Sequence, residues 1–257
     1  MSLYGRKVRA WSYMWLASMQ HSSHHMLVSG FNNKFITNSF YTKFLGVTMN
    51  NTLSWNNHIE LLVKKLSKAC YIVRNAKTYI SAPSLKMIYY TFFHSVMSYG
   101  IIFWGNSCHS SIIFRLQKKV IRIMEGCGNR VSCRGLFRKF QILPLKSQYI
   151  LSLLMFVVQN RTLFLTNTEN YSLDTRQRNN LYLPQANLII FQKGAYYSGI
   201  KVFNNLPLEI KNVAGNKKKK LWKNFYTLIH FTQWKSTLDN CELSTVSQDL
   251  FYSDTLI

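Results

Sequence analysis

Four cations near the middle of the sequence have the spacing of one helix face. They stand at positions i, i+3, i+4 and i+7 of a helix predicted over residues 111–125, and they are Arg115, Lys118, Lys119 and Arg122. At about 100° per residue, this spacing places all four side chains on one narrow side, opposite the apolar residues. Like charges on adjacent turns repel one another, and the sequence holds almost no acid beside them. The pattern therefore favours a surface that faces phosphate groups over an ordinary solvated face.

The acidic residues are too few and too scattered for two-metal phosphoryl transfer, which needs carboxylates that hold two ions about 4 Å apart. The first Asp is Asp174, and the only acids before Glu169 are Glu60 and Glu125, on different predicted helices. The sequence has no serine-hydrolase elbow, no P-loop and no dinucleotide-binding glycine motif. We therefore predict no catalytic residue in this chain.

Two groups of side chains offer metal ligands, but neither has the spacing of a zinc finger or knuckle. The first group is Cys108, His109, Cys127 and Cys133, and the second is His21, His24 and His25. For the first group, buried or surface thiols are favoured over a structural zinc site. For the second, a solvated leader is favoured over a transition-metal site. No metal or cofactor is predicted.

The composition indicates a folded and strongly basic protein. The chain has 257 residues, of which 47% are hydrophobic, and this is enough apolar material to exclude disorder throughout. Its 32 Lys and Arg against 9 Asp and Glu give a formal net charge of +23. An excess of this size indicates a polyanionic partner.

The cysteines and the apolar stretches indicate the compartment. Five cysteines without a dense, even spacing favour a reducing environment, so we expect a nuclear or cytoplasmic protein and not a secreted one. No uninterrupted apolar run reaches the roughly 18 residues of a membrane span. Residues 88–104 and 149–158 come nearest and are predicted as buried helices. A cationic protein that lies on an anionic membrane surface is the alternative class.

The sequence pattern predicts a mainly α fold that begins with short strands. Residues 34–37 and 41–48 are predicted as two strands around Asn38 and Ser39. A first helix is predicted from Ser54, whose side chain can cap it, and a second from Ser81 to Gly100 or Gly105, with Pro83 in its first turn. The helix over 111–125 is predicted to stop at Gly126. A short helix over 132–140 and a more apolar one from 145 to about 158 follow.

Five strings of residues carry a resemblance to a known family. They are YTKFLGVTMNNTLSWNNHI at 41–59, SYGIIFWG at 98–105, LQKKVIRIM at 116–124, LF at 136–137 with ILPL at 142–145, and FNNLP at 203–207. Together and in this order they resemble the region behind the palm in reverse transcriptases of non-LTR retrotransposons, of the jockey type. The similarity extends over about residues 41–211.

The resemblance implies the following organisation of the chain. It gives palm-edge strands over 31–53, a helical thumb-like bundle over 54–160 and a small mixed C-terminal extension over 186–235. Outside the similarity or by composition, we expect an unrelated or disordered leader over 1–30, a polar linker over 161–185 and an acidic tail over 236–257. In the family, the catalytic carboxylates and their Mg²⁺ lie upstream of the Phe-Leu-Gly strand, in an aromatic-x-Asp-Asp turn. No acid precedes Phe44 here. We therefore expect an inactive, truncated polymerase fragment; completion by the palm of a full-length element is an alternative.

The resemblance also implies a partner, because polymerase thumbs hold an RNA–DNA hybrid or duplex DNA by its backbone. The candidate nucleic-acid-binding residues are Lys64, Lys65, Lys68, Arg115, Lys118, Lys119, Arg122, Arg134 and Arg138. If six of them meet phosphates, the logarithm of the affinity should fall with the logarithm of salt concentration with a slope of about −5. Tyr89, Tyr90 and Trp104 could stack on bases, although at helical spacing a place in the core is favoured.

Overall fold

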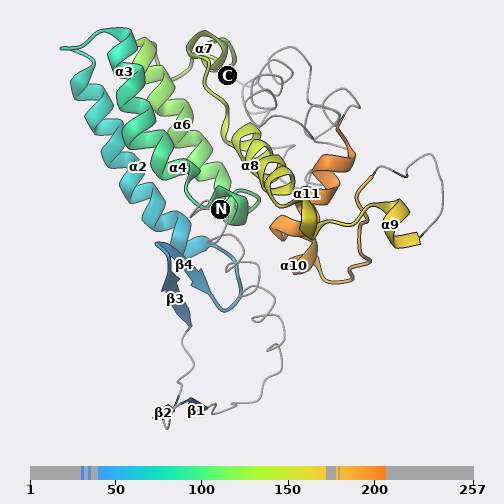
Figure 1. Ribbon diagram of the computed structural model, residues 1–257. Helices are drawn as coiled ribbons and strands as arrows, with labels where there is room; N and C mark the ends of the chain where they lie inside the picture. Colours follow the sequence, from blue (N-terminus) through green and yellow to red (C-terminus); the bar gives the residue numbers. More distant parts are fainter. Residues whose placement is uncertain (1–29, 32–33, 36–39, 172–177, 179, 207–257) are drawn as a thin grey trace. The chain divides into compact units, whose positions relative to one another are not determined.

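Helices make up most of the described chain, and short strands lie at its N-terminal side, so the predicted mainly α fold is confirmed. The computed structural model describes residues 30–31, 34–35, 40–171, 178 and 180–206 (Figure 1). The predicted leader up to residue 29, the extension beyond Leu206 and the acidic tail over 236–257 lie outside these residues. The chain divides into two units, residues 1–42 and 43–257. In the first unit, β1 (Gly30–Phe31) pairs antiparallel with β2 (Lys34–Phe35).

Residues 41–50 form a hairpin whose turn the sequence pattern did not predict. β3 (Tyr41–Phe44) and β4 (Val47–Asn50) are neighbours in a two-stranded sheet. Leu45 and Gly46 between them have φ angles of 47° and 82°, the two positive values of a tight hairpin turn. The prediction of a single strand over residues 41–48 was therefore wrong. The apolar residues on both sides of Gly46 favoured the prediction of a continuous strand. Gly46 permits the turn because it has no Cβ.

The first long helix is α2 (Asn56–Ala76), and its start differs from the prediction. Its N-cap residue is Trp55, which has a left-handed φ of 62° and makes no side-chain cap. The predicted cap Ser54 instead receives its contacts from Asn50, whose Oδ1 accepts the Ser54 N–H at 2.9 Å and whose Nδ2 donates to the Ser54 Oγ at 2.7 Å. The Asn50 side chain thus closes the turn between β4 and α2 and withdraws Ser54 from the helix end.

The second helix is continuous from Ala82 to Ser98 but changes geometry in its middle. α3 (Ala82–Ile88) leads into the π-helical segment η1 (Tyr89–His94) and then α4 (Ser95–Ser98), and α5 (Ile101–Trp104) follows after a break. Pro83 lies in the first turn, as predicted. The π segment was not predicted. The hydroxyls of Thr91 and Ser95 donate to carbonyls four residues earlier in the chain, a pattern that often accompanies distorted helices.

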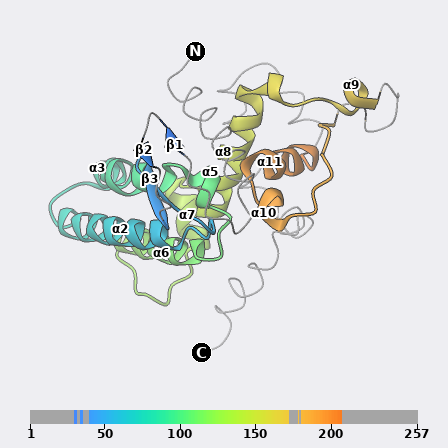
Figure 2. The ribbon, with the colours of Figure 1, turned by 90° about the horizontal axis from the view of Figure 1, so that it is seen from below.

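Three helices of the second unit, α2, the α3–η1–α4 helix and α6 (Ser110–Glu125), lie side by side, and the predicted cations are on α2, on α6 and on the short helix that follows α6. α6 ends at Gly126, whose φ of 87° allows the left-handed cap that the sequence predicted. It packs along α2, and both contact the α3–η1–α4 helix (Figure 1, Figure 2). α7 (Arg134–Phe140) packs against α6, where its Phe137 ring stacks with Phe114 at a centroid distance of 6.3 Å. Phe93, Trp104 and Val120 are fully buried among these helices.

The remaining helices form a more apolar group. α8 (Leu145–Gln159) buries side chains around most of its circumference and packs on α5 and on α11 (Ala195–Asn204). Between them lie η2 (Arg161–Leu163), α9 (Asn167–Tyr171) and α10 (Ile189–Gln192). Among the described helices, none is by itself long and apolar enough to cross a membrane. α7 and α8 would qualify only as a pair, and they are bent by 52°.

Candidate nucleic-acid interface

The predicted cations lie on three helices, on the sides that face away from the core. Seven of the nine are exposed, namely Lys64, Lys65, Lys68, Arg115, Lys119, Arg134 and Arg138, and two are half-buried, namely Lys118 and Arg122. On α2, Lys64 and Lys68 stand opposite the buried stripe of Leu62, Leu66 and Val73. Lys65 lies at the edge of this stripe, where its charge acts on the buried His58. Rigid helices thus hold the charges at fixed spacings, which suits contacts with a regular phosphate backbone.

The buried side of α6 is rotated slightly from its predicted position. Its buried residues are Ser110, Ile113, Gln117, Val120, Ile121 and Met124. Leu116 and Ile123, which we expected on the apolar side opposite the cations, are only half-buried, because they flank the buried side. The Leu116 carbonyl lies 4.0 Å from the Cys70 Sγ of α2, so this flank faces α2. The cationic stripe remains opposite the core, as predicted.

The stripe on α6 divides into two pairs with different surroundings. The Lys118 ammonium lies 5.3 Å from the centre of the Phe114 ring, and the Arg122 Nε donates to the Val131 carbonyl at 2.8 Å. Arg115 and Lys119 make no hydrogen bond or ion pair with any residue that the structure describes. Arg115 and Lys119 are therefore the cations of the stripe most available to a ligand.

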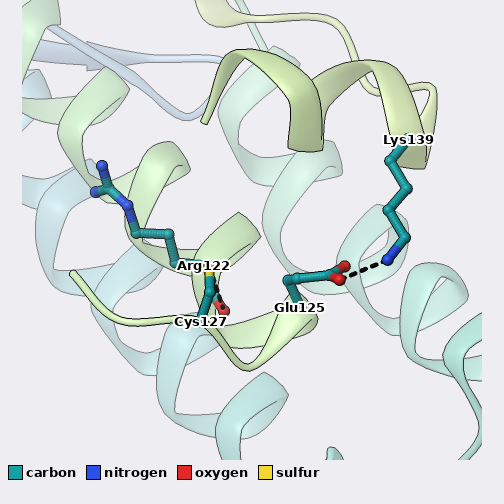
Figure 3. Close-up of polar contacts among 4 residues, drawn as sticks. All are labelled: Arg122, Glu125, Cys127 and Lys139. Carbon is teal, nitrogen blue, oxygen red and sulfur yellow. Dashed lines mark hydrogen bonds and ion pairs between the residues drawn. The ribbon is translucent and has the colours of Figure 1, made fainter. Parts of the chain in front are cut away.

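Glu125, the one acid beside the stripe, forms an ion pair with a lysine of another helix. The Glu125 Oε1 lies 2.5 Å from the Lys139 Nζ of α7, and Figure 3 shows the Arg122 side chain extending away from this pair. It is the only ion pair between two described residues. Because Glu125 is satisfied by Lys139, the repulsion among the cations of the stripe is not relieved within the described protein.

A buried thiol identifies one cation of α2 and one of α6 that lie near each other. Burial raises the pKa of Cys70 to about 11, and the nearby charges of Lys119 and Arg74 oppose this shift. Lys119 of α6 and Arg74 of α2 therefore lie close to one thiol, and both are exposed. Arg74 was missing from the predicted interface. Its signal in the sequence is its position four residues after Cys70, on the side of α2 that faces α6.

Two of the three aromatic residues considered for base stacking belong to the core. Tyr89 and Trp104 are fully buried, and the Trp104 Nε1 donates to the Tyr99 carbonyl at 3.2 Å. Tyr90 is partly exposed, and its hydroxyl donates to the Gln141 carbonyl at 3.4 Å. Stacking of a base on Tyr89 or Trp104 is thus contradicted, because no base can reach either ring in this fold.

The possible zinc ligands are not brought together among the described residues, where no three His, Cys, Asp or Glu side chains form a cluster. Cys108 and His109 are in contact, with the Sγ and Nδ1 atoms 3.3 Å apart. Cys127 instead contacts the Arg122 carbonyl at 3.9 Å (Figure 3). Cys133 contacts the Lys118 carbonyl at 3.7 Å. The other group, His21, His24 and His25, lies outside the described residues.

Gln117 lies in the core and holds α6, the helix that carries the cationic stripe, against its neighbours. It is fully buried, and its Nε2 donates to the Tyr89 hydroxyl at 3.1 Å and to the Leu143 carbonyl at 2.9 Å. Its Oε1 accepts the Leu145 N–H at 2.9 Å. One side chain thus joins α6 to η1 and to the start of α8. This role was not predicted, although a glutamine among apolar core positions was a visible signal.

Residues in the other strings that carry the resemblance likewise hold elements together. The Tyr99 hydroxyl donates to the Leu45 carbonyl in the hairpin turn. The Asn204 side chain accepts the Leu181 N–H and donates to the Leu181 carbonyl, both at 2.8 Å. Together with Gln117, these contacts occur where distant segments of the chain meet. The strings therefore contain residues that fix the fold.

Comparisons with known protein families, with curated proteins and with solved structures find no match to this chain.

Proposed function

We propose that this chain binds nucleic-acid duplex, an RNA–DNA hybrid or DNA, through the outer sides of α2, α6 and α7 and without sequence preference. The observation that carries the proposal is the set of exposed cations on these helices, beside which the only carboxylate of α6 is paired with Lys139. Phosphate groups would supply the missing countercharge, and release of their counterions would drive binding. Contacts of this kind read the backbone and not the bases.

We further propose that the described helices correspond to the thumb region of a non-LTR retrotransposon reverse transcriptase. The support lies in the five strings of residues and in the contacts that Tyr99, Gln117 and Asn204 make between segments. A helical layer with a basic outer side is what such a thumb requires in order to hold a primer–template duplex.

We assign no polymerase chemistry to these residues. Glu60 and Glu125 lie on α2 and α6, and Glu125 is paired with Lys139. Synthesis would need carboxylates from the palm of another chain. Primer extension that occurs only after mixing with a full-length element would support such completion in trans, and extension by the purified chain alone would contradict our assignment.

The experiment that tests the binding proposal is fluorescence anisotropy with a labelled RNA–DNA hybrid at several salt concentrations. We expect a slope of about −5 in the plot of log affinity against log salt. Changing Arg115, Lys118, Lys119 and Arg122 to Gln should weaken binding and flatten the slope by up to about 0.9 for each phosphate that the variant no longer binds, with unchanged circular dichroism. The variant Lys193→Gln/Lys201→Gln/Lys86→Gln/Arg161→Gln is the matched control, because it also removes four cations but none from α2, α6 or α7. An unaltered slope in the quadruple variant would exclude the α6 stripe.

A second candidate function has one observation in its favour. Leu61 and Ile72 are 45% and 38% exposed on the same side of α2 as Lys65 and Lys68, which is a pattern also suited to an anionic membrane surface. Vesicle flotation that requires anionic lipid, together with no binding of the hybrid, would favour this alternative over the duplex.

A further inference from the structure

One aromatic side chain lies among the cations of the proposed interface. Tyr71 of α2 is 65% exposed, on the outer side of the helix. It makes no hydrogen bond and no ring contact with any described residue. Its ring is therefore open to a ligand, unlike Tyr89 and Trp104 in the core.

The neighbours of Tyr71 on the helix surface are cationic or polar. Residues three, four and seven positions away are neighbours on one helix face, with the nearest about 5–6 Å apart at Cβ. Within α2 these positions hold Lys64, Ser67, Lys68, Arg74 and Asn75, and all five are exposed. Residues 61–76 contain no acid. The charge around the ring thus complements a polyanion.

Two other exposed tyrosines of the second unit have a different arrangement, and Tyr79, which is 87% exposed, lies beyond the end of α2 and not on a helix face. The Tyr99 hydroxyl is committed to the Leu45 carbonyl, and the Tyr171 ring packs edge-on against Tyr182 at a centroid distance of 5.6 Å. Tyr171 also has Glu169 two residues before it. Of Tyr71, Tyr99 and Tyr171, only Tyr71 has both a free ring and cationic neighbours.

We propose that Tyr71 is a stacking platform for an unpaired base, with the flanking phosphates held by Lys68 and Arg74. The ligand is a single-stranded segment that adjoins the duplex bound by α2 and α6, so the inference rests on the proposed function. Base–aromatic stacking tolerates any sequence because every base has a π face. Paired bases inside a helix cannot offer that face, and the platform therefore distinguishes a tailed duplex from a blunt one.

The test compares two probes, a blunt RNA–DNA hybrid and the same hybrid with a single-stranded thymidine tail. We expect the unmodified chain to bind the tailed probe on the order of tenfold more tightly. Tyr71→Ala should abolish this preference and leave the affinity and salt slope for the blunt hybrid unchanged. Tyr71→Phe should retain the preference, because it keeps the ring. Phe92→Ala is the matched control, since Phe92 is 45% exposed on a helix face without charge.

The outcomes separate this inference from the function on which it rests. Equal binding of both probes by the unmodified chain, or a preference that survives Tyr71→Ala, would overturn the stacking platform. Steep, salt-dependent binding of the blunt hybrid in that same experiment would still support the duplex interface. Failure to bind either probe would overturn both.

Discussion

Two exposed faces of the same helical group differ sharply in charge. The outer sides of α2, α6 and α7 carry the nine predicted cations and Arg74, whereas residues 87–114, which include most of the α3–η1–α4 helix, hold no Lys, Arg, Asp or Glu. The neutral face is no less open to solvent, since Met87 is 70% and Phe92 is 45% exposed. Exposure alone thus does not decide where the cations lie.

The difference indicates that the cations are concentrated on particular helix faces. If the charge of +23 were only a general bias of composition, the cations should be spread over all exposed helix faces. Eleven of the described Lys and Arg lie on α2, α6 and α7, where neighbouring cations repel one another and the one acid of α6 is already paired, whereas residues 87–98 of the α3–η1–α4 helix carry none. A surface that retains such a cost is best explained by an anionic ligand.

The largest expected effect comes from Gln117, which joins the cationic helix α6 to the neutral helix. Gln117→Leu would leave the Tyr89 hydroxyl, the Leu143 carbonyl and the Leu145 N–H without their partner. At about 1–3 kcal/mol for each buried group left unpaired, the free energy of unfolding should fall by about 3 kcal/mol or more. Urea unfolding measures this change.

The control for that experiment lies on the same helix. Arg115→Gln changes an exposed residue without described partners, so its effect on stability should remain within about 0.5 kcal/mol. A loss of less than about 1 kcal/mol in Gln117→Leu would show that the buried amide does not hold the two faces together.

A smaller effect on stability should follow from the protonation of His58, a buried residue near the start of α2. Burial, and then the charge of Lys65, lower its pKa to about 4, and its Nδ1 accepts the Thr48 N–H at 3.4 Å. Between pH 6.5 and 4 the unfolded chain binds a proton that the folded chain does not, so stability falls as the pH falls. We expect a contribution of about 2 kcal/mol, allowing for solvent screening.

Unfolding curves at several pH values test this contribution. In His58→Gln the loss of stability between pH 6.5 and 4 should shrink, and the remainder includes His94, whose pKa burial also lowers. An identical pH profile in the variant and the unmodified chain would contradict the assignment to His58.

Within the α6 stripe, the two pairs of cations should contribute unequally to binding. Arg115→Gln/Lys119→Gln should reduce the salt slope by about 2, at about 0.9 per phosphate. Lys118→Gln/Arg122→Gln should reduce it by less, because these side chains already contact Phe114 and Val131. Salt-titrated anisotropy of both double variants measures the difference, and equal slopes would remove the distinction between the pairs.

The smallest effect concerns the one acid of α6. Glu125→Gln should release Lys139 to meet a phosphate and steepen the slope by up to about 0.9. The same change should cost less than about 1 kcal/mol of stability, because the ion pair is partly exposed. Salt-titrated anisotropy and urea unfolding measure the two effects. A shallower slope in this variant would mean that Glu125 aids binding.

The helices and their solvent sides could be predicted from sequence because their causes are local. The periodicity of α6, its stop at Gly126 and the entry of Pro83 into α3 depend on nearby residues alone. The predictions for the hairpin turn and the start of α2 were wrong, since these features depend on left-handed backbone at Leu45 and Trp55, which sequence patterns rarely reveal.

The positions of the nine predicted cations on helix faces could be predicted from helical spacing, whereas their contacts could not, and their role in an interface stays a prediction. The approach of Arg74 to Lys119, the ion pair of Glu125 with Lys139 and the buried contacts of Gln117 each require two segments distant in sequence to pack together. Such contacts are set by tertiary structure, which one sequence does not display.

The most direct test asks whether binding depends on where the cations lie or only on the net charge. It moves two positive charges from the cationic face to the neutral face. The variant Arg115→Gln/Lys119→Gln/Thr91→Lys/Ser95→Lys keeps the net charge but transfers two cations from α6 to exposed positions on the neutral helix. Its affinity for the RNA–DNA hybrid is measured by anisotropy across salt concentrations, beside the unmodified chain and Arg115→Gln/Lys119→Gln. We expect it to bind as weakly, and with as shallow a slope, as the double variant. Affinity and slope equal to those of the unmodified chain would show that net charge alone governs binding and would contradict a defined interface.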